Sequence, residues 1–66
     1  MDLQTLRRKY RTLRPVLTER SRRVWAASEA VALGYGGIGF VEKATGISRS
    51  TISRGIREQA GRTSLP

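Results

Sequence analysis

The chain contains no cysteine and no histidine. Without cysteine, neither a disulfide nor a thiolate metal site can stabilise it. Without histidine, it lacks the commonest zinc ligand and the side chain that ordinarily titrates near neutral pH. A chain of 66 residues has room for one small domain that buries little surface. We therefore expect no metal ion and no other cofactor, and a stability that comes from helix packing, a partner or a neighbouring domain.

Long apolar segments and acidic residues are also scarce. No run approaches the roughly 20 apolar residues of a membrane span, and Met1–Gln4 does not start a signal peptide. We expect a cytoplasmic, nucleoid-associated protein with no membrane partner. The five acidic residues are scattered, and no nucleophile stands beside a base, so no catalytic residues and no enzyme activity are predicted.

Positive charge is abundant. Eleven arginines and two lysines against five acidic residues give a net charge of +8. Guanidinium groups suit phosphates and guanine edges better than ammonium groups do, and such a charge favours a polyanionic partner, most often nucleic acid. The alternatives are a solubilising surface or a GC-rich genome that favours arginine codons.

The spacing of apolar residues predicts four helices. The first covers about 2–13 and is stopped by Pro15. The second is expected to follow the N-cap Thr18 and to end at about Leu33, and the third covers about 38–45. The fourth is expected to follow the N-cap Ser48 and to end at about Ala60. Glycines follow the last three, at positions 34, 46 and 61. In the second helix, one apolar stripe consists of Val24, Ala27 and Val31, with Trp25, Ala30 and Leu33 beside it.

These helices predict an all-α fold, a small bundle of about four helices that ends in a helix-turn-helix. The predicted organisation is a helical hairpin over 1–33 that supports the core, the helix-turn-helix over 34–61, and a frayed tail over 62–66. Gly46 permits a sharp left-handed turn. Ile47 fills the gap between the two helices, and Ile52 with Ile56 holds the last helix against the core.

The free face of the last helix is the candidate DNA-binding site. Arg49 and Arg54 are the candidates for guanine edges, and Ser50 lies near the helix start, within reach of the bases. Thr51, Ser53 and Arg57 are predicted to contact phosphates. The predicted DNA-binding residues are Ser48, Arg49, Ser50, Thr51, Ser53, Arg54 and Arg57.

Glu42 and Gly55 depart from the usual helix-turn-helix pattern. Glu42 stands where a small residue usually meets the facing helix; either it turns to solvent and pairs with an arginine, or the two helices sit slightly apart. Gly55 costs about 1 kcal/mol relative to alanine inside a helix. It would allow another helix to approach closely.

Other conspicuous residues have two interpretations each. Trp25 and Tyr35 could stack on bases, but packing in a small core is favoured. The glycines at 34, 36 and 37 could cradle a phosphate, but without a Walker pattern a loop is favoured. The basic run over 20–23 fits a contact with the DNA backbone and a solvated helix face equally well.

The stretch over 46–54, Gly-Ile-Ser-Arg-Ser-Thr-Ile-Ser-Arg, resembles the helix-turn-helix of the lactose-repressor and resolvase-like families. A longer similarity over about 2–60, with Arg-Arg-Val-Trp-Ala-Ala at 22–27 and Leu-Gly-Tyr-Gly-Gly at 33–37, resembles the N-terminal region of ISAzo13-type insertion-sequence transposases. That resemblance implies a head that binds transposon ends, ahead of an acidic, RNase-H-like catalytic domain. The carboxylate cluster such a domain needs is absent, so it implies a transposase fragment without catalytic activity.

The predicted function is thus sequence-specific binding of double-stranded DNA. The alternative is a helical interaction or dimerisation module without DNA-binding activity of its own. Its partner would be a second copy of the chain or the missing catalytic domain.

Overall fold

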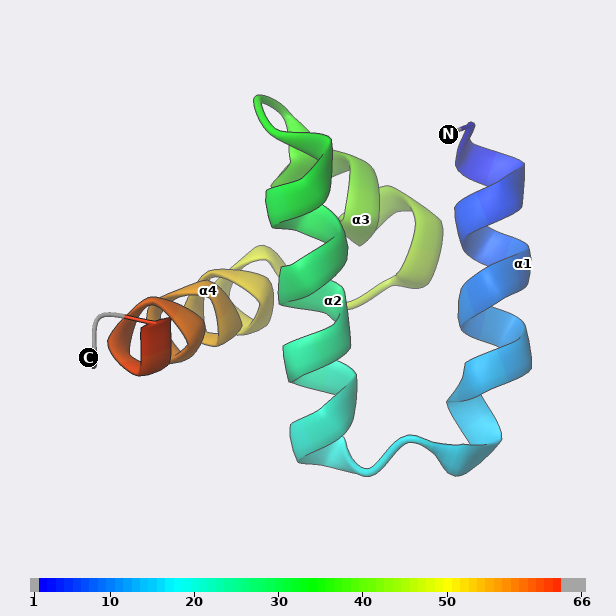
Figure 1. Cartoon of the computed structure of the whole chain (residues 1–66). Coiled ribbons are helices and arrows are strands. Elements are labelled where there is room, and N and C mark those ends of the chain that lie inside the picture. Colours follow the sequence, from blue (N-terminus) through cyan, green and yellow to red (C-terminus); the bar gives the residue numbers. More distant parts are fainter. Residues whose placement is uncertain (1, 64–66) are drawn as a thin grey trace.

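The computed structural model describes residues 2–63, which form four α-helices, one short 3-10 helix and no strand (Figure 1). The predicted all-α bundle is confirmed. The elements are α1 (Leu3–Leu13), η1 (Arg14–Val16), α2 (Glu19–Leu33), α3 (Gly37–Thr45) and α4 (Arg49–Thr63). The prediction that the last helix ends at Gly61 is wrong, because a glycine lowers helix stability without breaking the helix. Two residues of the expected tail are thus helical, and the other three, 64–66, lie outside the described residues.

The helix ends follow local capping signals. The Asp2 carboxylate accepts a hydrogen bond of 2.7 Å from the Thr5 N–H, and this bond lowers the pKa of Asp2. Before α2, the Thr18 hydroxyl accepts from the Ser21 N–H at 3.1 Å, and the Ser21 hydroxyl accepts from the Thr18 N–H at 2.7 Å. This reciprocal pair is a capping box. The predicted N-cap Thr18 and C-cap Gly34 are both confirmed.

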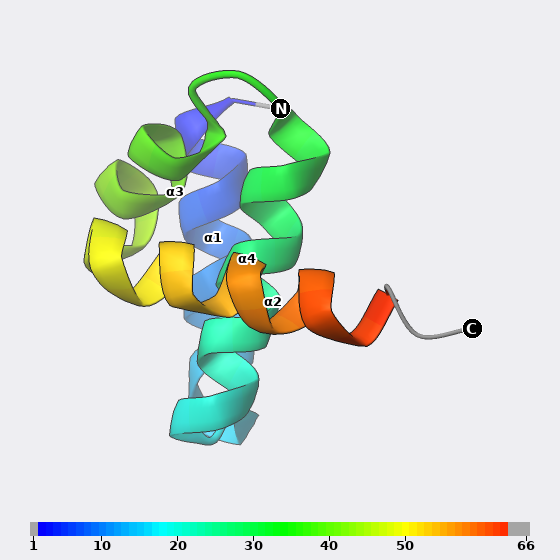
Figure 2. The same cartoon turned by 90° about the vertical axis from the view of Figure 1, so that its left-hand side faces the viewer.

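The other helices are arranged around α2. Figures 1 and 2 show α4 crossing one side of α2, with α1 on the opposite side. The backbone of α1 packs mainly against α3 rather than α2. The two helices of the predicted hairpin meet through side chains instead: the Tyr10 and Trp25 rings stack with centroids 5.4 Å apart, and Lys9 Nζ lies 3.4 Å from the Glu29 carboxylate.

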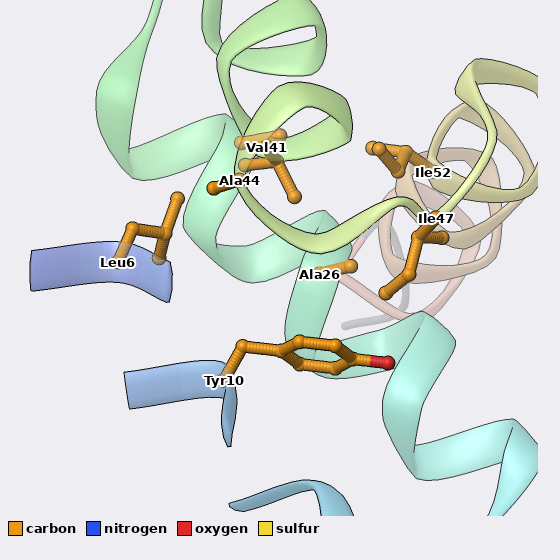
Figure 3. Close-up of a cluster of buried hydrophobic side chains, with 8 residues drawn as sticks. Leu6, Tyr10, Ala26, Val41, Ala44, Ile47 and Ile52 are labelled. Carbon is orange, nitrogen blue, oxygen red and sulfur yellow. The ribbon is translucent and has the colours of Figure 1, made fainter. Parts of the chain in front are cut away.

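Side chains from every α-helix meet in one core. Figure 3 shows Leu6 and Tyr10 of α1, Ala26 of α2, Val41 and Ala44 of α3, and Ile52 of α4 in one cluster with Ile47 from the turn before α4. Leu6, Val41 and Ile52 are fully buried. The first half of α4 is therefore anchored in the same core that fixes α1 and α3.

The apolar side of α2 agrees with the predicted stripe only in part. Its buried residues are Ala26, Ala27 and Ala30, whereas Val31 is 57% exposed. Small side chains on α2 allow the backbones of α3 and α4 to approach closely, and Val31 lies at the edge of this contact. Trp25 is half-buried in its stack on Tyr10, which supports packing. For Tyr35 the packing interpretation is wrong, because its side chain is fully exposed in the loop before α3.

Candidate nucleic-acid interface

Residues 46–48 form the tight turn between α3 and α4. Gly46 has a φ of 80°, in the left-handed region, where other residues are strained by about 1–2 kcal/mol. Its N–H donates to the Glu42 carbonyl at 2.8 Å. Ile47 is buried, and its N–H donates to the Thr45 hydroxyl at 3.1 Å. The roles predicted for Gly46 and Ile47 are confirmed.

Ser48 is the N-cap of α4, as predicted. Its hydroxyl oxygen accepts a hydrogen bond of 3.2 Å from the Thr51 N–H and donates to the Thr51 hydroxyl at 2.9 Å. It also lies 3.2 Å from the Ser50 hydroxyl. Ser48 and Thr51 are thus held in a small hydroxyl network around the helix start, which fixes the direction in which α4 leaves the turn.

Glu42 pairs with a backbone amide and not with the arginine side chain expected if it turned to solvent. It is half-buried, and its carboxylate accepts a hydrogen bond of 3.2 Å from the backbone N–H of Arg49, the first residue of α4. A carboxylate at a helix N-terminus satisfies a free amide and complements the helix dipole. Glu42 therefore joins α3 to the start of α4, beside the cap that Ser48 provides.

Replacing Glu42 by alanine is expected to lower the free energy of unfolding by about 1 kcal/mol, because the Arg49 amide loses its partner. Glu42→Gln keeps a hydrogen-bond acceptor and loses only the charge, so it should cost less than half as much. Urea unfolding followed by circular dichroism measures both. Equal losses for the two variants would show that the charge, and not the hydrogen bond, stabilises the junction.

Gly55 lies where α4 crosses α2. A Cβ on Gly55 would stand 2.7 Å from the Arg23 carbonyl oxygen and 2.9 Å from the Ala27 Cβ. Only glycine permits this separation of the two backbones. The predicted close approach of another helix at Gly55 is confirmed, and that helix is α2.

Polar side chains hold the second half of α4 on α2. Arg23 donates to the two carboxylate oxygens of Glu58 at 2.9 and 3.4 Å, and this contact lowers the pKa of Glu58. The Gln59 amide donates to the Val24 carbonyl at 2.9 Å and to the Ser28 hydroxyl at 2.8 Å. Sequence patterns had not singled out Glu58 or Gln59, whose partners are 31–35 positions away.

The predicted site residues separate into an outward face and a cap. Ser50, Arg54 and Arg57 are exposed at spacings of four and three, with half-buried Ser53 beside them. We call Ser50, Ser53, Arg54 and Arg57 the outward face of α4. Ser48 and Thr51 belong to the cap. The structure thus brings four of the seven predicted residues onto one exposed surface.

The exposed arginines of α4 differ in their contacts. Arg54 Nε lies 3.7 Å from the Glu58 carboxylate one turn later, and the Arg54 side chain remains 64% exposed. Arg49 is also exposed, but its Nη1 lies 3.5 Å from where a Cβ on Gly39 would stand. Its guanidinium therefore lies back over α3. Arg54 and Arg57 are better placed than Arg49 to reach a ligand in front of α4.

In the described part of the chain, no helix is long and apolar enough to cross a membrane. The same residues contain no group of three or more acidic side chains positioned to hold a metal ion. Comparison with known proteins found no matching family model, no matching curated protein and no matching solved structure.

Proposed function

We propose that this chain binds double-stranded DNA sequence-specifically as a helix-turn-helix, with α4 as the helix that enters the major groove. The observation that carries the proposal is the division of α4 into two faces. Ile52 and Gly55 are buried in the core and on α2, while Arg54 and Arg57 stand exposed on the outward face.

The dimensions and charge of α4 support this proposal. Its 15 residues make a helix about 22 Å long, and the major groove of about 12 Å admits one helix. Arginine is the residue most often paired with guanine O6 and N7 there. The net charge of +8 adds the long-range attraction that a DNA-binding domain needs. The specific role we propose is recognition of transposon ends, as in the DNA-binding part of a transposase.

Selection from random duplexes tests the proposal first, because a recovered motif supplies the specific site. On that site, Arg54→Ala is expected to weaken binding about tenfold or more, and on unrelated duplexes much less, as about 1–3 kcal/mol for a base contact implies. The matched control is Arg11→Ala, the same loss of charge at an exposed residue of α1, on the side of α2 away from α4 (Figure 2). Failure to recover any motif, with no salt-sensitive duplex binding, would reject DNA recognition.

A helical interaction module is the second candidate. Val31 is 57% exposed and lines a cavity of about 250 Å³ with Ile56, Gln59 and Ala60 at the junction of α2 and α4. An apolar surface of this kind suits contact with a second copy or with a catalytic domain. Sedimentation equilibrium over a wide concentration range distinguishes the candidates: a concentration-dependent dimer disrupted by Val31→Lys, without DNA affinity, favours the interaction module.

A further inference from the structure

A cavity of about 350 Å³ lies beside the start of α4. It is open to solvent and is lined by the last turn of α1, η1, the first turns of α2, the end of α3 with the turn over 46–48, and the first turn of α4. We call it the Arg22 cavity. Its charged lining residues are Arg14, Glu19, Arg22 and Arg23, and the cap residues Ser48 and Thr51 line it from the start of α4.

The charge of the Arg22 cavity is positive. Three guanidinium groups line it against one carboxylate, that of Glu19. Arg23 is bound to Glu58, outside the cavity. Within the described residues, Glu19 forms no ion pair with any of the three arginines. Among the described residues, Arg14 and Arg22 are neutralised by no ion pair, so the cavity keeps an excess of positive charge that attracts an anion.

Two residues that line the Arg22 cavity carry hydrogen-bond donors for which the described residues supply no acceptor. The Nε of Arg22 is shielded from solvent and has no hydrogen-bond partner in the described part of the chain. A shielded donor without a partner costs about 1–3 kcal/mol, so such groups call for an explanation. The Thr51 hydroxyl accepts from Ser48, and no acceptor for its own proton is found among residues 2–63. An anion in the cavity would offer acceptors to the Arg22 guanidinium group and to the Thr51 hydroxyl.

The position of the cavity relates it to the outward face of α4. Thr51 lines the cavity from the first turn of α4, one residue after Ser50 of the outward face. A duplex with its groove on that face has a phosphate backbone along each side of the groove. The volume exceeds that of a phosphate group, whose oxygens replace a few waters of about 30 Å³ each.

We propose that the Arg22 cavity binds a phosphate group of the DNA backbone, with Arg22 and Thr51 donating hydrogen bonds and Arg14 contributing charge. This inference rests on the proposed DNA binding. Such a contact fixes the register of α4 in the groove without distinguishing bases. A DNA backbone phosphate and free inorganic phosphate present the same oxyanion. The experiment must therefore distinguish these two ligands.

The test uses the whole chain and two variants. Arg22→Met keeps an apolar stem of similar length and removes both the charge and the unpaired Nε–H, so the fold should be retained. Thr51→Val removes only the hydroxyl. Arg11→Met on α1 is the matched control. Circular dichroism verifies that each variant folds. The affinity for one fixed duplex is then measured at salt concentrations from about 50 to 200 mM.

Arg22→Met is expected to reduce the slope of log K against log salt by about 0.9, the value for one lost phosphate contact. The loss of affinity should be equal on specific and unrelated duplexes. Thr51→Val should weaken binding severalfold with an unchanged slope, and Arg11→Met should change neither quantity. A folded Arg22→Met variant with the wild-type slope and affinity overturns the proposal.

Titration with inorganic phosphate, followed by NMR of the Arg22 Nε–H and the Thr51 amide, is the second arm. Perturbation of both signals, together with the reduced DNA slope, supports a phosphate site used by DNA. Phosphate binding without an effect of Arg22→Met on DNA overturns the DNA assignment in favour of a free phosphate. If the wild-type chain binds no duplex at all, the proposed function fails, and this arm alone then decides whether the cavity is an anion site.

Discussion

Gly55→Ala is expected to lower the free energy of unfolding by about 2 kcal/mol. The new Cβ would stand 2.7 Å from the Arg23 carbonyl oxygen and 2.9 Å from the Ala27 Cβ. One of these neighbours is backbone, so α4 has to move away from α2 to relieve the contact. Overpacking of this kind costs about 1–3 kcal/mol, and the better helix propensity of alanine offsets up to about 1 kcal/mol. The cost of overpacking should exceed the gain in helix propensity, because the Arg23 carbonyl oxygen belongs to the backbone and cannot move away by a change of rotamer.

Gly61→Ala is the matched control for this prediction. Gly61 belongs to the same helix, and a Cβ there would meet nothing within 4 Å. Only the propensity effect applies, so this variant should be more stable by up to about 1 kcal/mol. Thermal unfolding should show a decrease in Tm of roughly 10 °C for Gly55→Ala and a small increase for Gly61→Ala. A shift of the same sign in both variants would contradict the packing explanation.

A loss of this size is large for so short a chain. Domains are typically stable by about 0.05–0.15 kcal/mol per residue, which for 66 residues is roughly 3–10 kcal/mol. The variant therefore loses a fifth or more of the stability expected. If α4 enters the major groove, DNA affinity should also fall at temperatures where the variant is still folded, because the outward face has moved relative to the Arg22 cavity.

The helix boundaries were predictable because they depend on local chemistry. Thr18 and Ser48 cap helices with their own hydroxyls, and the amides they bind are three residues away. Gly34 and Gly46 end helices with positive φ angles. Interactions over three or four positions can be recognised in the sequence without knowledge of the fold, so the starts of α2 and α4 were predicted correctly.

The burial of α2 was not predictable in the same way. Which side of this helix is covered depends on where α3 and α4 cross it, and Gly37 and Gly55 permit the close approach of the backbones at those crossings. Val31 was assigned to the apolar stripe but is largely exposed, whereas Ala26 is fully buried. Tyr35 is exposed for a related reason: the loop that carries it projects beyond the ends of α2 and α3 (Figure 1).

For the candidate site, the exposed face of α4 could be predicted from the apolar residues on its buried face. Because Ile52 and Ile56 point toward the core, Ser50, Arg54 and Arg57 had to point away. The connections between elements were less accessible. Glu42 contacts an amide seven positions later, and Arg23 contacts Glu58 across 35 positions. Such contacts depend on the crossing angles of helices, which apolar periodicity does not specify.

Gly37→Ala is expected to be still more destabilising, by about 3 kcal/mol. A Cβ on Gly37, the first residue of α3, would collide with the Ala30 carbonyl oxygen and lie 3.0 Å from its carbon and 3.1 Å from the Leu33 Cβ. Two of these three atoms belong to the α2 backbone. The sequence placed this glycine in a loop, but its role is to let α3 begin against α2. Because α3 carries Glu42 and leads into the turn before α4, its displacement should also loosen the start of α4.

Gly36→Asn separates this packing effect from backbone strain. Gly36 has a φ of 79°, and a Cβ there would meet nothing within 4 Å. Asparagine tolerates the left-handed conformation, so this variant should lose no more than about 1 kcal/mol. Urea unfolding measures both variants, with an unchanged m-value showing that the unfolding reaction is the same. Because Gly36 and Gly37 are neighbours in one chain segment, a loss below about 0.5 kcal/mol for Gly37→Ala would mean that the segment can shift freely, and that α3 is positioned by its contacts with α1 instead.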